Sequence, residues 1–218
     1  MIYEEFVRVS RDPAVELFTV RAAESLGRDP LLVIHGGPDW DHAYLLDPLA
    51  KLADRHDVIF PDLRGCGRST RGLPDDQYTP AAATAEVWSD PALSGPALTR
   101  AAAFAGAEAD VWRAEALDAY RERLSRVRFS AEWLRPWRAG TLPPARPDRA
   151  AGRLAVLGVP ILLLHGRRDM TFPAALTERA GELIPSARAV LLDEAGHMAH
   201  VDRPGAWLAA VADFLSAP

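Results

Sequence analysis

The 218-residue chain has one cysteine, Cys66, one lysine, Lys51, and no asparagine. A single cysteine rules out a disulfide framework and is too few for a zinc site built from cysteine thiolates. Alanine, arginine and proline are abundant. This bias is typical of a GC-rich genome, so we assign no function to the arginines on composition alone.

Long apolar runs and basic runs are missing too. A membrane-spanning helix needs about 18 or more consecutive apolar residues, and no stretch of the sequence approaches that length. The acidic N-terminus, residues 1–5, lacks the basic and then apolar pattern of a signal peptide. A net charge of -5 without a basic cluster argues against nucleic-acid binding. We therefore expect a cytoplasmic protein with neither a membrane nor a nucleic-acid partner.

The composition that is present, 49% hydrophobic and 25% charged, is that of an ordinary globular protein. The length suits one domain, or one domain with a small inserted lid. Residues 2–9 and 15–22 alternate between apolar and polar around Asp12-Pro13, a turn signal. This pattern predicts an antiparallel hairpin at the start of the chain.

Short apolar runs typical of buried parallel strands occur near both ends of the chain, separated by segments with helical spacing. The predicted strands are 31–34, 58–60, 159–164 and 189–192, and the predicted helices are 45–52, 174–183 and 201–215. Between them, residues 79–151 contain no strand-like run. That part predicts one long helix over 107–127 and a proline-rich linker over 140–148.

This order predicts an α/β fold with a doubly wound, mostly parallel sheet and a small helical cap. We expect residues 1–84 to form the N-terminal part of the core, residues 85–150 the cap, and residues 151–218 the C-terminal part of the core. Polar motifs follow the strands directly. The carboxyl edge of such a sheet is where ligands bind.

Four motifs follow the predicted strands. They are His35-Gly36-Gly37-Pro38, Asp62-Leu63-Arg64-Gly65-Cys66-Gly67-Arg68-Ser69, His165-Gly166-Arg167-Arg168-Asp169 and Gly196-His197. As an ordered set they resemble the signatures of proline iminopeptidases and their relatives in the α/β-hydrolase fold family. The resemblance implies a hydrolase of small amides or esters that acts on a small molecule or short peptide and needs no cofactor or metal.

The resemblance also implies roles for single residues. His197 corresponds to the family's catalytic base, and Asp169 to the carboxylate that orients it and stabilises its imidazolium form. A helix N-cap is the alternative role for Asp169. The Gly36-Gly37 turn frees backbone N–H groups to face a developing oxyanion. A tight strand-to-helix turn is the alternative interpretation of these two glycines.

Other polar residues are interpreted as structural. We expect Asp62 and Arg64 to form a structural pair or turn, with positive-φ glycines beside them, and Ser69 to be structural rather than nucleophilic. His200 forms an H-x-x-H pattern with His197, but cysteine or acidic companions at ligand spacing are missing, so surface or lid packing is favoured over a metal site. In the resembled peptidases the lid supplies acidic residues that hold the substrate's amino group. Candidates by location are Glu86, Asp90, Glu108, Asp110 and Glu115, although solvated helix faces explain them equally well.

The nucleophile motif of the family is absent. The sequence contains no G-x-S-x-G pentad, and no aspartate or cysteine version of it. A βαβ unit takes about 30 residues or more, and about two such units are missing between the second motif and the cap. The strand ending at Ile34 could then pair with the strand ending at Leu164. We expect lower stability from this loss, or a homo-oligomer that covers the exposed face.

Three functions remain open. The first is a hydrolase of small amides or esters. The second is an Asp–His dyad enzyme without a covalent nucleophile, which would act as a general base on water or on an acidic C–H, as in a lyase, a cofactor-free oxygenase or a water-activating hydrolase. The third is a non-catalytic or degenerate relative.

Overall fold

The computed structural model describes residues 1–23, 30–36, 39–73, 95–141 and 148–217. It divides the chain into two compact units. Unit 1 consists of Met1–Ala105 and Arg123–Ala145, and unit 2 consists of Gly106–Glu122 and Arg146–Pro218. The first ten residues of the expected cap, 85–94, and most of the proline-rich linker, 142–147, lie outside the described residues.

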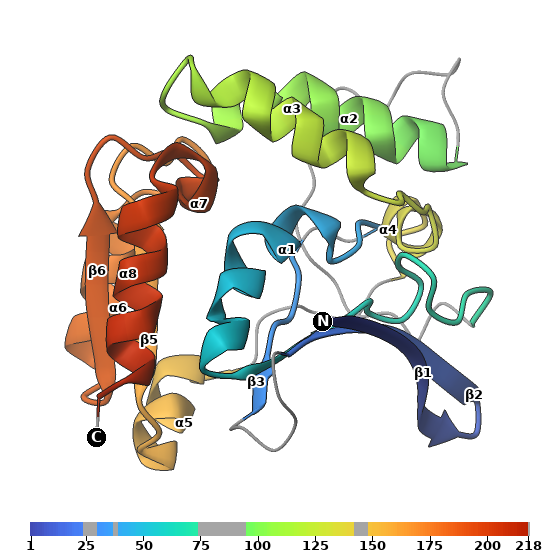
Figure 1. Cartoon of the computed structure of the whole chain (residues 1–218), viewed down its shortest axis with the longest axis horizontal. Coiled ribbons are helices and arrows are strands. Elements are labelled where there is room, and N and C mark those ends of the chain that lie inside the picture. Colours follow the sequence, from blue (N-terminus) through green and yellow to red (C-terminus); the bar gives the residue numbers. More distant parts are fainter. Residues whose placement is uncertain (24–29, 37–38, 74–94, 142–147, 218) are drawn as a thin grey trace. The chain divides into compact units, whose positions relative to one another are not determined.

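Unit 1 begins with the predicted hairpin, which the structure confirms (Figure 1). Strand β1 (Ile2–Arg11) pairs antiparallel with β2 (Ala14–Ala22) around the Asp12-Pro13 turn. Alternate side chains of β2, among them Phe18 and Val20, are buried. The apolar face of β2 therefore lies on the core of unit 1, whereas β1 is exposed along most of its length.

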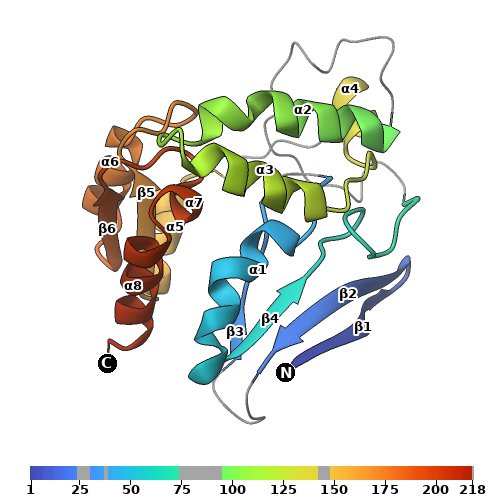
Figure 2. The ribbon, with the colours of Figure 1, turned by 45° about the horizontal axis from the view of Figure 1, so that its top comes forward.

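The sheet of unit 1 continues through two strands that run parallel to each other. Its order is β1-β2-β4-β3, with β3 (Pro30–Leu32) parallel to β4 (Asp57–Pro61), as the apolar runs predicted (Figure 2). Helix α1 (Ala43–Leu49) and the 3-10 helix η1 (Ala50–Asp54) connect them. Val58 and Phe60 are fully buried because β4 has a strand on each side.

Unit 2 contains a second, smaller parallel sheet. Strand β5 (Ile161–Gly166) pairs with β6 (Ala187–Leu192), and α6 (Ala175–Leu183) connects them. Helices α6 and α8 (Pro204–Leu215) pack against the two strands, and α5 (Ala150–Leu157) precedes them (Figure 1). The single helix predicted over 201–215 is wrong at its start. The chain forms α7 (Ala199–Asp202) and then α8, because Pro204 fits the first turn of a new helix and disfavours helical geometry at Arg203.

Each unit contains one of the two sheets that the structure describes. Within unit 1, β3 lies at the edge of its sheet, and within unit 2, β5 pairs with β6. The expected pairing of the strand ending at Ile34 with the strand ending at Leu164 would join the two units and stays a prediction.

The stretch of sequence between β4 and α5 forms three helices in its described part. They are α2 (Gly95–Asp110), α3 (Ala116–Arg126) and α4 (Leu134–Arg138). The single long helix predicted over 107–127 is wrong, because the chain leaves the helix after Asp110. The main-chain N–H groups of Trp112 and Arg113 donate to the Asp202 carboxylate, so they cannot continue the helical ladder. Among the described residues, no helix is long and apolar enough to cross a membrane.

Candidate active site

Asp169 and His197 are in contact at one end of the β5–β6 sheet. His197 Nδ1 lies 2.9 Å from Asp169 Oδ2. An ionised carboxylate only accepts hydrogen bonds, so Nδ1 carries the proton, and Nε2 of the neutral ring is the acceptor. The two residues meet although they are 28 positions apart. Each follows a strand, and neighbouring parallel strands end at the same edge of a sheet.

The surroundings of Asp169 keep it ionised. Its side chain is 3% exposed, and its Oδ1 accepts the main-chain N–H groups of Thr171 at 2.7 Å and Phe172 at 2.9 Å. His165 Nε2 lies 3.2 Å from Asp169 Oδ2. Burial alone would raise the pKa of the Asp169 carboxyl. The hydrogen bonds from His197 and from the two N–H groups outweigh burial and hold that pKa below its usual value.

The N-cap alternative for Asp169 is wrong. Helix α6 begins at Ala175, and its N-cap residue is Ala174, which makes no side-chain capping bond. Asp169 instead fixes the loop before the helix through Thr171 and Phe172. The carboxylate thereby holds its own loop in place while its second oxygen contacts the histidine.

Two glycines allow the loops of the site to approach each other closely. A Cβ added at Gly166 would lie 2.1 Å from the Gly196 carbonyl oxygen, and a Cβ added at Gly196 would lie 2.9 Å from both Asp110 O and Trp112 N. Neither position tolerates a side chain unless the backbone moves. Gly166 therefore brings the Asp169 and His197 loops together, and Gly196 brings the histidine loop against the C-terminal end of α2.

Asp202 anchors the histidine loop, and the sequence analysis missed this residue. Its side chain is almost fully buried, with a residue exposure of 1%. It accepts three main-chain N–H groups, from Gly196 at 2.7 Å and from Trp112 and Arg113 at 2.9 Å each. Local periodicity placed Asp202 on an unbroken helix, and only its distant partners reveal its role.

Asp110, one of the acidic candidates for holding a substrate's amino group, lies beside the Asp169–His197 pair. Asp110 accepts a hydrogen bond from Tyr120 Oη at 3.0 Å. The pKa of Asp110 is raised, mainly by burial, although the hydrogen bond from Tyr120 lowers it. The charges of His197 and Asp169 also act on this pKa, the first lowering it and the second raising it. Glu108 on α2 forms an exposed ion pair with Arg121 on α3, and Glu115 forms one with Arg113 in the loop between these helices. The two remaining candidates, Glu86 and Asp90, lie outside the described residues.

The reactive nitrogen of His197 has no hydroxyl partner in its unit. Among the described residues of unit 2, no hydroxyl hydrogen-bonds to Nε2. The histidine side chain is 31% exposed, and the Phe172 ring packs beside it at a centroid distance of 5.7 Å. Within unit 2, Nε2 is thus the ring nitrogen that Asp169 leaves unbonded.

The two nucleophile-bearing residues of the second motif, both in unit 1, serve the fold. Ser69 Oγ accepts the Phe18 N–H at 2.8 Å and donates to the Asp62 carbonyl at 2.6 Å. This arrangement confirms the structural interpretation of Ser69. Burial raises the pKa of the Cys66 thiol to about 12, so the thiol is not an activated thiolate.

The glycine turn predicted as an oxyanion loop is described only in part. Gly37 lies outside the described residues, and the Gly36 N–H donates to Tyr44 Oη at 2.9 Å. Burial raises the pKa of Tyr44 to about 12, so this hydroxyl keeps its proton. His35 Nε2 accepts the Leu63 N–H at 3.0 Å and ties the turn to the second motif. In this structure Gly36 serves the turn, and its N–H is already engaged.

Asp62 of the second motif belongs to the one group that resembles a metal site in the described part of the chain. Asp41, His42 and Asp62 place a potential ligand atom each within 4.8 Å of one another. Their atoms are already bonded. Asp62 accepts from His42 Nδ1 at 2.7 Å and from the Arg68 N–H at 2.9 Å, and Asp41 accepts two further main-chain N–H groups. We interpret this group as a structural network.

Two further expectations concern glycine and histidine. Gly65 and Gly67 have φ values of 78° and 49°, which confirms the predicted positive-φ bend. His200 is buried, with 6% exposure, and its ring packs 5.9 Å from that of Trp207. Because Trp207 lies in α8 and not in the expected cap, the expectation of surface or lid packing for His200 is wrong.

Comparisons with known proteins agree with this architecture. The family model described as alpha/beta hydrolase fold matches residues 29–90 and 88–204. A proline iminopeptidase of Lactobacillus delbrueckii subsp. lactis is 45% identical over 67 residues, and one of Lactobacillus acidophilus is 43% identical over 63 residues. These matches cover 30% and 28% of this chain but only 21% and 20% of the relatives, about a fifth of their length.

Solved structures resemble the chain from end to end. A thermophilic esterase from Thermogutta terrifontis has a TM-score of 0.63 at 20% identity, covering 98% of each chain. The 2-hydroxy-6-oxo-6-phenylhexa-2,4-dienoate hydrolase of Rhodococcus sp. strain RHA1 has a TM-score of 0.63 at 16% identity, covering 100% of this chain and 99% of that one. A bromoperoxidase from Bacillus anthracis has a TM-score of 0.68 at 13% identity, covering 99% and 100%. At such identities the likeness concerns the fold alone.

Proposed function

The chain belongs to the α/β-hydrolase fold family, and we propose that it hydrolyses small esters or amides through the Asp169–His197 pair, with water as the nucleophile in place of a serine. One observation carries this proposal. His197 Nδ1 is bonded to Asp169 at 2.9 Å, and within the described residues of unit 2 its Nε2 has no hydroxyl to activate. A histidine held this way is a general base for a water molecule.

The reaction proceeds without a covalent intermediate. His197 Nε2 takes a proton from water while the water oxygen bonds to the substrate carbonyl carbon. The Asp169 carboxylate, held ionised by its hydrogen bonds, stabilises the imidazolium that forms. His197 then returns the proton to the leaving alcohol or amine as the C–O or C–N bond breaks, and the carboxylic acid product remains.

The sequence supports the absence of a serine nucleophile. The chain contains no G-x-S-x-G pentad. The family model matches in two pieces that meet at residues 88–90, which is where the elbow segment would have been lost. The second motif offers no substitute, because Ser69 is bonded at both ends and the Cys66 thiol is protonated.

Asp110 favours a substrate with a free amino group, as the names of the iminopeptidase relatives suggest. Its carboxylate accepts a hydrogen bond from Tyr120 and lies near enough to His197 and Asp169 for their charges to act on it. An ammonium group bound there would sit beside the reacting bond. The substrate class proposed is therefore a small amide or ester of an amino acid.

Hydrolysis of proline 4-nitroanilide and 4-nitrophenyl acetate tests this function. We expect His197→Ala to lower kcat/KM for both by about a hundredfold or more, since general-base catalysis contributes about that much. His56→Ala, a partly exposed histidine in unit 1, is the matched control and should leave turnover unchanged. Equal turnover by wild type and His197→Ala would remove the proposed function.

A second comparison isolates the amino-group preference. Asp110→Asn should weaken hydrolysis of proline 4-nitroanilide but not of its N-acetyl derivative, because only the first carries an ammonium group. Glu108→Gln, on the same helix and in an exposed ion pair, is the control. An equal effect of Asp110→Asn on both substrates would contradict the assignment of Asp110 and leave that of His197 standing.

A further inference from the structure

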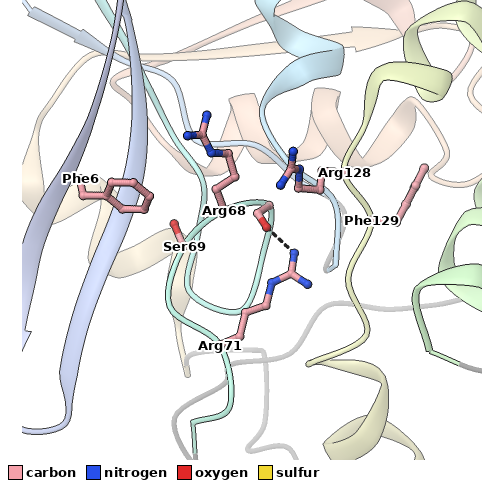
Figure 3. A pocket seen from close by; sticks show the side chains of 7 residues that line it. Phe6, Arg68, Ser69, Arg71, Arg128 and Phe129 are labelled. Atoms are coloured by element: carbon pink, nitrogen blue, oxygen red, sulfur yellow. Dashed lines mark hydrogen bonds between the residues drawn. The ribbon is translucent and has the colours of Figure 1, made fainter.

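A pocket in unit 1 is lined mainly by arginine and phenylalanine. It has a volume of ≈ 630 Å³ and opens between β1, the loop of the second motif and the segment that follows α3 (Figure 3). Arg68, Arg71 and Arg128 line it together with Phe6 and Phe129. The proposed hydrolytic pair lies in unit 2, so this pocket belongs to a different part of the chain.

Two of the three guanidinium groups lack a carboxylate partner in the described part of the chain. Arg128 makes a single hydrogen bond to the described residues, from its main-chain N–H to Asp41, and its side chain makes none. Arg71 donates through its guanidinium to the Gly67 carbonyl, a neutral acceptor. Arginine stays charged at any physiological pH, so both groups present to the pocket a positive charge that no carboxylate of the described residues pairs with.

The third guanidinium is fixed in place. Arg68 pairs with Glu4 at 2.8 Å and stacks over the Phe18 ring at 3.8 Å from its centroid. This pair is largely exposed and neutralises part of the Arg68 charge. Arg68 therefore forms a rigid wall, and the free cationic groups are those of Arg71 and Arg128.

The carboxylates near the pocket are bonded to other groups. Asp41 and Asp62 are buried, lie next to Gly67 and accept hydrogen bonds from main-chain N–H groups and from His42. Glu132 accepts the Gly72 N–H at 2.9 Å, directly after Arg71. Among the described residues, no carboxylate pairs with Arg71 or Arg128. The lining thus combines these two guanidinium groups with the exposed Phe6 ring.

We propose that this pocket binds a small aromatic carboxylate. The planar guanidinium forks of Arg71 and Arg128 match the geometry of a carboxylate, with which they form charge-assisted hydrogen bonds. The exposed Phe6 ring offers an apolar face for the aromatic body of the ligand, whereas the Phe129 ring is buried and packs against Trp40 at a centroid distance of 5.8 Å. The pocket volume lies in the range of about 300–1,000 Å³ that small-molecule sites occupy.

Titration of the full chain with benzoate, followed by NMR, tests this site. We expect benzoate to bind more tightly than benzamide, its neutral analogue, and its binding to weaken as salt rises. Arg128→Gln should weaken benzoate binding about tenfold, the effect of losing a hydrogen bond to a charged group. Arg188→Gln is the matched control, because Arg188 is an exposed arginine in unit 2 and makes no side-chain bond within the described residues.

Further measurements compare ligand classes and check that the variants remain folded. Arg128→Gln should keep the wild-type urea midpoint, since its side chain bonds to no described residue. Phe6→Leu should weaken the binding of benzoate more than that of acetate, because the exposed Phe6 ring lines the pocket. The proposal would be overturned if benzoate bound no more tightly than benzamide. It would also be overturned if Arg188→Gln weakened benzoate binding as much as Arg128→Gln does. Binding of inorganic phosphate with no response to benzoate would overturn the aromatic carboxylate as the ligand.

Discussion

Replacing Gly166 with alanine should separate the loops that carry Asp169 and His197. The new Cβ would lie 2.1 Å from Gly196 O and 2.5 Å from Ala195 O. Real Cβ atoms keep at least 3.0 Å from such neighbours, so the loop must move by roughly 0.9 Å, the difference between 3.0 and 2.1 Å. Both contacted atoms belong to the main chain, so no side-chain rotation relieves the clash.

That displacement is large on the scale of the hydrogen bond it affects. His197 directly follows Gly196, and its Nδ1 lies 2.9 Å from Asp169 Oδ2. A shift of this size along the bond would take the distance beyond hydrogen-bond range. Overpacking at a site that cannot relax costs about 1–3 kcal/mol in the free energy of unfolding.

Ring ¹⁵N chemical shifts of His197 and urea unfolding measure both effects. In the wild type we expect the neutral ring to carry its proton on Nδ1, whereas Gly166→Ala should give a mixture of tautomers. Gly152→Ala is the control, because Gly152 lies exposed in α5 with no atom within 4 Å of a Cβ. It should gain about 0.5–1 kcal/mol from helix propensity. If Gly166→Ala kept the Nδ1–H tautomer and unfolded like Gly152→Ala, the close-approach reasoning would be refuted.

Three further predictions concern groups that hold the fold. Asp202→Ala should lower the free energy of unfolding by about 3 kcal/mol, because one buried and two partly buried N–H groups lose a charged acceptor, whereas the exposed Asp213→Ala should stay within about 0.5 kcal/mol in the same urea titration. Ser69→Ala should cost about 1–3 kcal/mol by the same measurement, since it leaves the buried Phe18 N–H without an acceptor. The pKa of Asp62 is lowered on folding, because hydrogen bonds from His42 and Arg68 outweigh burial. Its contribution is therefore complete above the ordinary value of 3.8 and is lost as the pH falls below it. Denaturation between pH 6 and pH 2 should show this loss in the wild type but not in Asp62→Asn.

The hairpin and the parallel strands could be predicted from local patterns, and the Asp169–His197 pair from the resemblance to the α/β-hydrolase family. Alternation marks β1 and β2, and short apolar runs mark the parallel strands. Asp169 and His197 follow two strands that are successive in the chain and adjacent in the sheet. Motif order and strand adjacency therefore coincide, and the contact follows from them.

Features that depend on distant partners could not be predicted. The break after Asp110 arises because Asp202, about ninety residues away, binds the N–H groups of Trp112 and Arg113. The engagement of the Gly36 N–H depends on Tyr44, whose hydroxyl reaches back from α1. The antiparallel pairing of β2 with β4 depends on which strands find partners, and apolar runs alone do not specify pairing.

Treatment with a fluorophosphonate, followed by intact mass and by turnover of proline 4-nitroanilide, tests most directly whether the Asp169–His197 pair works without a covalent serine. We predict an unchanged mass and undiminished turnover in the wild type, and loss of turnover in His197→Ala. A stoichiometric adduct on a serine, formed in step with loss of turnover, would contradict water as the nucleophile.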